Sequence, residues 1–235
     1  MIKNKRILAV VPARGGSKGI KLKNLREVGG IPLVARVGIV LQALPFVDRA
    51  VVSTDNDDIA RVAEGAGIAA PFRRPPELSG DRIGDLEVLT DALLQTEAID
   101  GVTYDIVLML QPTSPLRQAK DVEATIQKVV NEDWDAVWTV SPTDSKAHPL
   151  KQLTVYGPGK ALGYYDLAGS KIIARQQLDQ LYHRNGVAYA ITRECLMEQK
   201  TIMGRRTGAH IVETAEISID TEWDLMLANF VLVSK

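Results

Sequence analysis

The chain has 235 residues, and its 28 lysines and arginines nearly balance 29 aspartates and glutamates, giving a formal net charge of −1. This length predicts one large domain, or one domain with a small appendage. The balanced charge argues against a nucleic-acid or membrane-surface partner. The single cysteine, Cys195, cannot form an intrachain disulfide, which favours a reducing cytoplasm.

Strand-length apolar runs alternate with helix-like stretches along most of the chain. The runs are 7–12, 50–53, 68–72, 106–110, 136–140 and 187–191. The helix-like stretches are 32–44, 56–66, 83–98 and 119–132, and a last apolar helix extends to Leu232. Continuously apolar runs indicate strands buried on both faces, as in a parallel sheet with helices on each side. We therefore predict an α/β fold with three layers and a mostly parallel, twisted sheet.

Residues 142–182 interrupt this alternation. We expect 1–141 and 183–235 to form the α/β domain, with 142–182 as an insert. Residues 155–163 predict two short strands around a Gly-Pro-Gly turn. Such a hairpin has little core of its own, so its apolar side chains are expected to pack on another surface. An ordinary surface excursion is the alternative.

A glycine-rich, basic loop follows the first apolar run. It contains Arg14, Gly15, Gly16, Ser17, Lys18 and Gly19, and the cations continue with Lys21 and Lys23. Glycines let backbone N–H groups approach an anion, and Arg and Lys donate charge-assisted hydrogen bonds to phosphate. The loop is not a Walker A loop, because Ser17 precedes Lys18, nor a dinucleotide fingerprint, because Gly15 and Gly16 are adjacent. It predicts a triphosphate ligand; a solvated turn is the alternative.

Five motifs, in order along nearly the whole chain, resemble those of the cytidylyltransferases that activate nonulosonic acids, the CMP-sialic acid synthetases. They are ARGGSKGIKLKN at 13–24, RPPEL at 74–78, LQPTSPLR at 110–117, RQQLDQLYHRNGVAY at 175–189 and ISIDT at 217–221. The resemblance implies a Rossmann-like nucleotidyltransferase fold. It also implies transfer of CMP from CTP to the anomeric hydroxyl of a nine-carbon 2-keto sugar acid, with release of pyrophosphate.

The resemblance implies a role for each matched residue. Nucleotide contacts are implied for Ala13, Arg14, Gly15, Gly16, Ser17, Lys18, Asn24 and Arg74. Sugar-acid contacts are implied for Gln111, Arg175, Tyr182, Asn185 and Tyr189, whereas Arg117 is expected to anchor its loop. The implied catalytic residues are Lys23, Arg14 and Asp220, and Asp220 also binds the Mg²⁺ that coordinates the CTP phosphates. The insert is implied to form a homodimer and to reach over the partner's active site.

Several departures leave alternatives open. Ser218 stands where the family has an aspartate, which puts a second tightly held metal in doubt. Gly84 and Asp85 stand where relatives often carry small hydroxyl residues, so no cytosine contact is carried over. Asp220 could instead cap the C-terminal helix. A synthetase for an eight-carbon sugar acid and a non-catalytic nucleotide-binding protein remain alternatives. The sugar is not identified, although residues 182–189 and Ser218 lean toward a legionaminate-type substrate.

Overall fold

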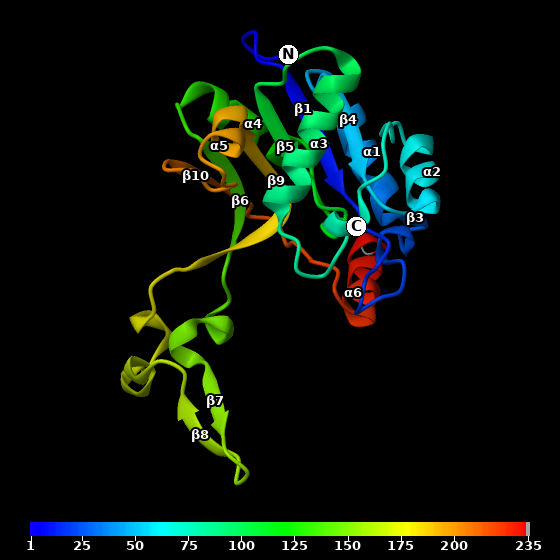
Figure 1. Cartoon of the computed structure of the whole chain (residues 1–235). Coiled ribbons are helices and arrows are strands. Elements are labelled where there is room, and N and C mark those ends of the chain that lie inside the picture. The colour runs from blue at the N-terminus through cyan, green and yellow to red at the C-terminus, as the bar shows by residue number, and fades with distance from the viewer. Residues whose placement is uncertain (234–235) are drawn as a thin grey trace.

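A computed structural model describes residues 1–233 and centres on a six-stranded sheet in the order β10-β6-β9-β5-β1-β4 (Figure 1). The strands are β1 (Ile7–Pro12), β4 (Arg49–Ser53), β5 (Ile106–Met109), β6 (Ala136–Pro142), β9 (Tyr182–Thr192) and β10 (Thr207–Ile211). β1 lies parallel to β4 and β5, and β6 lies parallel to β10. β9 is antiparallel to both of its neighbours, β5 and β6. The predicted mostly parallel sheet is confirmed, with β9 as its reversed strand.

Helices cover both faces of this sheet. The described helices are α1 (Leu33–Gln42), α2 (Asp57–Gly65), α3 (Asp85–Asp100), α4 (Ala119–Asn131), α5 (Arg193–Met197) and α6 (Glu222–Val233). Side chains of β1 alternate in direction. Ile7 and Val11 therefore pack with α1, α2 and α4, and Leu8 and Val10 pack with α3 and α5. The predicted three-layer α/β fold is confirmed, and the four predicted internal helices correspond to α1 to α4.

One predicted strand, 68–72, is wrong. Only Ala69 pairs there, in an isolated parallel bridge to Val51. Gly67 adopts a φ of +83° just before the run, and Pro71 has no N–H to donate to a ladder. β10 and α5 were not predicted, because the sequence TGAHI lacks an apolar run and α5 is only five residues long.

The insert extends away from the α/β body (Figure 1). It contains an antiparallel hairpin of β7 (Leu153–Tyr156) and β8 (Ala161–Tyr164), which confirms the predicted hairpin. The other regular elements of the insert are short 3-10 turns. Its large apolar side chains are open to solvent, including Leu162 at 69% and Ile173 at 93% exposure. The insert therefore has no core able to hold it alone.

The C-terminal segment returns to the first loop. α6 packs beside the short hairpin of β2 (Glu27–Val28) and β3 (Ile31–Pro32). Ile20, Ile219 and Leu225 belong to the small buried cluster between these elements. This cluster holds the C-terminal segment against the first loop near the carboxyl end of β1. Among residues 1–233, no helix is long and apolar enough to cross a membrane.

Candidate active site

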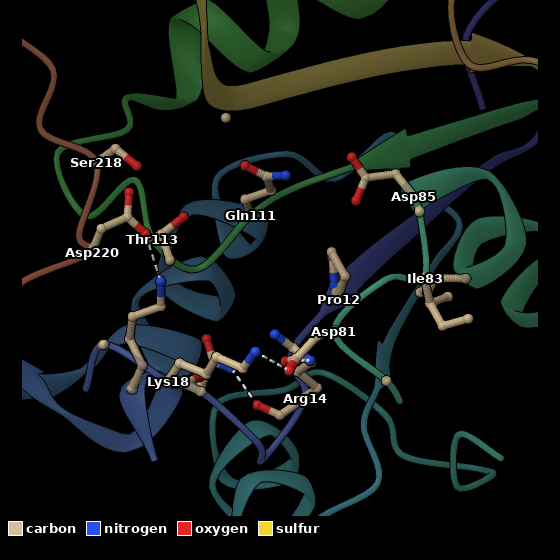
Figure 2. Close-up of a pocket in the computed structure, with 18 of the residues that line it drawn as sticks. Pro12, Arg14, Lys18, Asp81, Ile83, Asp85, Gln111, Thr113, Ser218 and Asp220 are labelled. Atoms are coloured by element: carbon tan, nitrogen blue, oxygen red, sulfur yellow. Dashed lines mark hydrogen bonds and ion pairs between the residues drawn. The ribbon is translucent and has the colours of Figure 1, made fainter. Parts of the chain in front are cut away.

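A cavity of about 750 Å³ lies where β1 and β5 end, a size typical of ligand pockets. Open parallel sheets bind their ligands at this edge. In Figure 2, Ser218, Thr113 and Asp220 lie on one side of the cavity, and Ile83 and Asp85 lie on the other. Arg14, Lys18 and Asp81 lie together at its lower edge. The cavity therefore brings together segments from both ends of the chain and from the middle.

The first loop uses some of its backbone to hold its own shape. The N–H of Gly15 donates to the Asp55 carboxylate at 2.8 Å, and the N–H of Ser17 donates to the Gly15 carbonyl at 3.1 Å. These two amides are thus already paired in the ligand-free protein. Ala13, which is fully buried, and the glycines Gly15 and Gly16 do not line the cavity, although nucleotide contacts were predicted for them. The residues of this loop that line the cavity are Arg14, Ser17, Lys18 and Gly19.

Two cations of the loop share one carboxylate. Asp81 accepts a 2.8 Å hydrogen bond from the Arg14 guanidinium and lies 2.6 Å from Lys18 Nζ. The Arg14 guanidinium also donates to the Ser79 carbonyl at 3.3 Å. Hydrogen bonds from Lys18 and then Arg14 lower the pKa of Asp81. The carboxylate of Asp81 thus lies between the two loop cations, Arg14 and Lys18.

Asn24 holds the first loop, and Arg74 holds the end of β4. Both are buried, and both line the cavity. Arg74 donates to the hydroxyl of Ser53 at 3.0 Å and to its carbonyl at 2.6 Å, and burial lowers the pKa of Arg74. Asn24 donates to the Arg14 carbonyl at 2.9 Å. The side chain of Asn56 caps α2 by accepting the N–H groups of Asp58 and Ile59.

The Gln-Pro-Thr-Ser-Pro-Leu-Arg turn is fixed by its last residue. Buried Arg117 donates to the carbonyls of Gln111, Gly186 and Val187. This confirms that Arg117 anchors its loop. Burial lowers the pKa of Arg117 to about 10. Gly186 has a φ of +72°, and a Cβ there would come 2.5 Å from Gln111 Oε1. Glycine at 186 thus leaves room for the Gln111 amide at the cavity wall.

Asn185 and Tyr189 line the cavity next to the Gln111 turn, because β9 pairs with β5. The Asn185 side chain accepts from the Thr139 hydroxyl at 2.7 Å and donates to the Ser141 hydroxyl at 2.9 Å. The Tyr189 hydroxyl accepts the N–H of Gly186 at 2.9 Å, and burial raises the pKa of Tyr189. Both predicted sugar residues therefore line the cavity from positions already fixed by internal hydrogen bonds.

Lys23 and Asp220 both line the cavity and contact each other directly. Lys23 Nζ lies 2.9 Å from Asp220 Oδ1. A Cβ at position 19 would come 2.5 Å from the Asp220 carbonyl, so Gly19 permits the C-terminal segment to approach the loop. Asp220 does not cap α6. The cap is Thr221, whose Oγ1 accepts the N–H of Asp224 at 3.3 Å while Asp224 Oδ2 accepts the N–H of Thr221 at 2.7 Å.

The cavity offers little carboxylate for a metal. No group of three or more His, Cys, Asp or Glu side chains suitable for a metal occurs within residues 1–233. Asp220 lines the cavity with 71% of its side chain exposed, next to the hydroxyl residue Ser218. Mg²⁺ takes one or two carboxylates and completes its shell with water and phosphate oxygens. Asp220 alone therefore fits a Mg²⁺ that arrives with a phosphate ligand.

Two predicted sugar residues, Arg175 and Tyr182, do not line the cavity of their own chain. Arg175 belongs to a 3-10 turn in the insert, and Tyr182 begins β9 where the insert rejoins the body. The cavity instead contains Asp85 and Arg184, which sequence reasoning missed as site residues. Burial raises the pKa of Asp85, and the charges of Arg184 and Arg74 oppose this shift. Arg184 directly precedes the Asn185-Gly186 pair of the family motif, and this position could have indicated that Arg184 lies at the site.

The mostly parallel sheet, with a cationic loop after β1 and one exposed carboxylate opposite Lys23, defines a nucleotidyltransferase-type protein. The cytidylyltransferase family model matches residues 8–228. The chain is 30% identical to the CMP-N,N'-diacetyllegionaminic acid synthase of Campylobacter jejuni, over 97% of this chain and 96% of that protein. It therefore belongs to the cytidylyltransferase family, and within it to the CMP-nonulosonic acid synthetases.

A second relative and a solved structure agree with this assignment. The protein of the same name from Legionella pneumophila is 31% identical over 92% of this chain and 91% of its own length. The structure of CMP:2-keto-3-deoxy-manno-octonic acid synthetase complexed with CTP has a TM-score of 0.71 at 19% identity, covering 98% of this chain and 99% of that one. At that identity the structural likeness concerns the fold. The family resemblance predicted from the motifs is confirmed.

Proposed function

We propose that this protein transfers CMP from CTP to the anomeric hydroxyl of a nonulosonic acid and releases pyrophosphate. The observation that carries the proposal is the Lys23–Asp220 pair, which faces the cationic loop across a cavity in a chain of this family. Relatives named for N,N'-diacetyllegionaminic acid support a legionaminate-type, nine-carbon sugar. A cytoplasmic location is consistent with the free, buried thiol of Cys195.

In the proposed reaction the anomeric hydroxyl attacks the α-phosphorus in line, and the bond to pyrophosphate breaks. Positioning and charge neutralisation by the protein lower the barrier. Arg14, Ser17 and Lys18 bind the phosphates, with Arg74 and Asn24 holding the nucleotide side. Lys23 stabilises the charge that develops at the α-phosphate. Gln111, Asn185 and Tyr189 orient the sugar acid. The proton of the attacking hydroxyl is lost to solvent water.

A Mg²⁺ ion bound at Asp220 would supply Lewis-acid stabilisation of the phosphate oxygens. Asp220 would hold it, and Ser218 would contribute at most a weak hydroxyl ligand. Lys23 and Asp220 form an ion pair. We expect each of the two side chains to change its partner when the metal nucleotide binds. Lys23 would then face phosphate oxygen, and Asp220 would face the metal.

We also propose that the insert forms a homodimer and carries Arg175 and Tyr182 toward the partner's cavity. The hairpin exposes large apolar side chains on one face, where Leu153 and Val155 of β7 lie opposite Tyr164 and Leu162 of β8. Exposed apolar surface of this kind marks protein interfaces. Arg175 lies outside its own cavity, so it can bind the sugar carboxylate only in the cavity of a second copy. Mixing an inactive Lys23→Ala variant with an inactive Arg175→Ala variant tests this. Recovery of up to about one quarter of the activity supports shared sites, and no recovery contradicts them.

The test of the proposed reaction is pyrophosphate release with CTP and Mg²⁺ across a panel of nine-carbon and eight-carbon 2-keto sugar acids. UTP, ATP and GTP serve as matched nucleotide controls. We expect turnover with N,N'-diacetyllegionaminate or a close nine-carbon analogue. Turnover with the eight-carbon acid alone would favour the related octonic acid synthetase activity. CTP binding without any turnover would favour a non-catalytic nucleotide-binding protein.

A further inference from the structure

Asp81 stands where a phosphate of the nucleotide is expected. Its two carboxylate oxygens are divided between the loop cations, one at 2.8 Å from Arg14 NH1 and the other at 2.6 Å from Lys18 Nζ. A carboxylate in this position offers the same kind of acceptor oxygens that a phosphate would offer. In Figure 2, Asp81 lies with these cations at the lower edge of the cavity.

The segment that carries Asp81 can release it. Asp81 lies in the loop between the 3-10 turn Pro76–Leu78 and the start of α3. The Asp81 side chain is 41% exposed and the Lys18 side chain is 80% exposed. Exposed ion pairs contribute little net stability, because water and salt screen them. The ion pairs of Asp81 are therefore short, but breaking them costs little free energy.

A phosphate group cannot take both cations while Asp81 holds them. Either the phosphates displace Asp81, or they bind without full use of Arg14 and Lys18. A triphosphate carries several negative charges against the single charge of Asp81, so displacement favours the nucleotide. Pyrophosphate must leave the same cations after the reaction, and a returning carboxylate would compete with it.

From this geometry we infer that Asp81 is a displaceable internal anion that sets the affinity of the site for phosphate-bearing ligands. It occupies the Arg14–Lys18 cradle in the free protein, gives way to CTP, and returns as pyrophosphate leaves. Asp81 is thus an affinity-determining residue that acts by competition. The inference rests on the proposed function, because it takes CTP as the ligand.

The experiment compares wild type with Asp81→Asn, which keeps the shape and removes the charge. Calorimetric titrations without sugar acid would use Mg²⁺–CTP, Mg²⁺–pyrophosphate and cytidine. We expect CTP and pyrophosphate to bind about three- to tenfold more tightly to Asp81→Asn, and cytidine, which has no phosphate, to bind equally. Glu77→Gln is the matched control, since it removes one exposed charge nearby and should leave all three affinities unchanged.

Weaker CTP binding by Asp81→Asn would overturn the inference, because Asp81 would then be holding Arg14 and Lys18 ready for the phosphates. Equal CTP binding by the two proteins would also overturn it. A parallel gain for cytidine would mean a general effect on the cavity and would overturn it as well. Failure of wild type to bind CTP would instead refute the proposed function itself, and the inference with it.

Discussion

Lys23 Nζ lies 2.9 Å from Asp220 Oδ1, although 197 residues separate them in the chain. The pair joins the basic loop after β1 to the segment that leads into α6. Lys23 is largely enclosed, whereas Asp220 is exposed to the cavity. A cation and a carboxylate placed in this way can act on one phosphate, the lysine directly and the carboxylate through a bound Mg²⁺.

Replacing Lys23 by alanine should remove the charge that stabilises the α-phosphate in the transition state. We expect kcat to fall about 10²–10³-fold, which corresponds to roughly 3–4 kcal/mol. Steady-state pyrophosphate release measures the effect. Lys21→Ala removes an exposed lysine from the same loop and should have near-normal turnover. Near-normal turnover of Lys23→Ala would refute the role of Lys23.

Changing Ser218 to aspartate should strengthen metal binding. The substitution adds a carboxylate beside Asp220, and divalent cations bind more tightly as the ligand charge rises. We expect the Mg²⁺ concentration for half-maximal activity to fall about three- to tenfold, and Asp220→Asn to raise it or abolish activity. Magnesium titration of turnover at saturating CTP gives both values. If Asp220→Asn keeps the wild-type magnesium dependence, Asp220 does not hold the metal.

Changing Asp85 to asparagine should stabilise the folded protein at neutral pH. Burial raises the pKa of Asp85 above its unfolded value, so its favourable contribution is complete below the unfolded pKa and is lost as pH rises through the folded pKa. The Tm of Asp85→Asn should therefore exceed that of wild type at pH 7.5, and the difference should shrink toward about pH 4. Thermal unfolding across this range measures it.

The same Asp85→Asn protein should lose activity, because the carboxylate lines the cavity. We expect kcat/KM for CTP or for the sugar acid to fall about tenfold, the cost of one hydrogen bond to substrate. Glu87→Gln is the control for the negative charge in the first turn of α3. A stabilised variant with full activity would show that Asp85 does not contact either substrate.

Replacing Arg117 by methionine should destabilise the whole fold. Its buried guanidinium donates to three carbonyls, which would all lose this donor. We expect a loss of about 3 kcal/mol or more in the free energy of unfolding. Urea denaturation measures the loss, with the exposed Lys120→Met as control. A loss below about 1 kcal/mol would contradict the anchoring role.

Local sequence was enough to predict the elements and motifs that local chemistry determines. The apolar runs predicted the buried strands, and the glycines and cations after β1 predicted an anion-binding loop. Arg117 was expected to anchor its loop, and it does so by donating to three carbonyls. The run at 68–72 failed as a strand, because Gly67 and Pro71 limit its pairing to one bridge.

Tertiary packing decided which of these residues meet. Asp81 contacts Arg14, which lies 67 residues earlier in the chain, and also Lys18. Asp85 of α3 and Arg184 of β9 line the same cavity. The insert carries Arg175 out of its own cavity, although its motif matched the family. The sequence specifies each residue type, and the residue type determines what a side chain can bind. The distance between two side chains depends on how strands and helices pack, and only the folded chain fixes it.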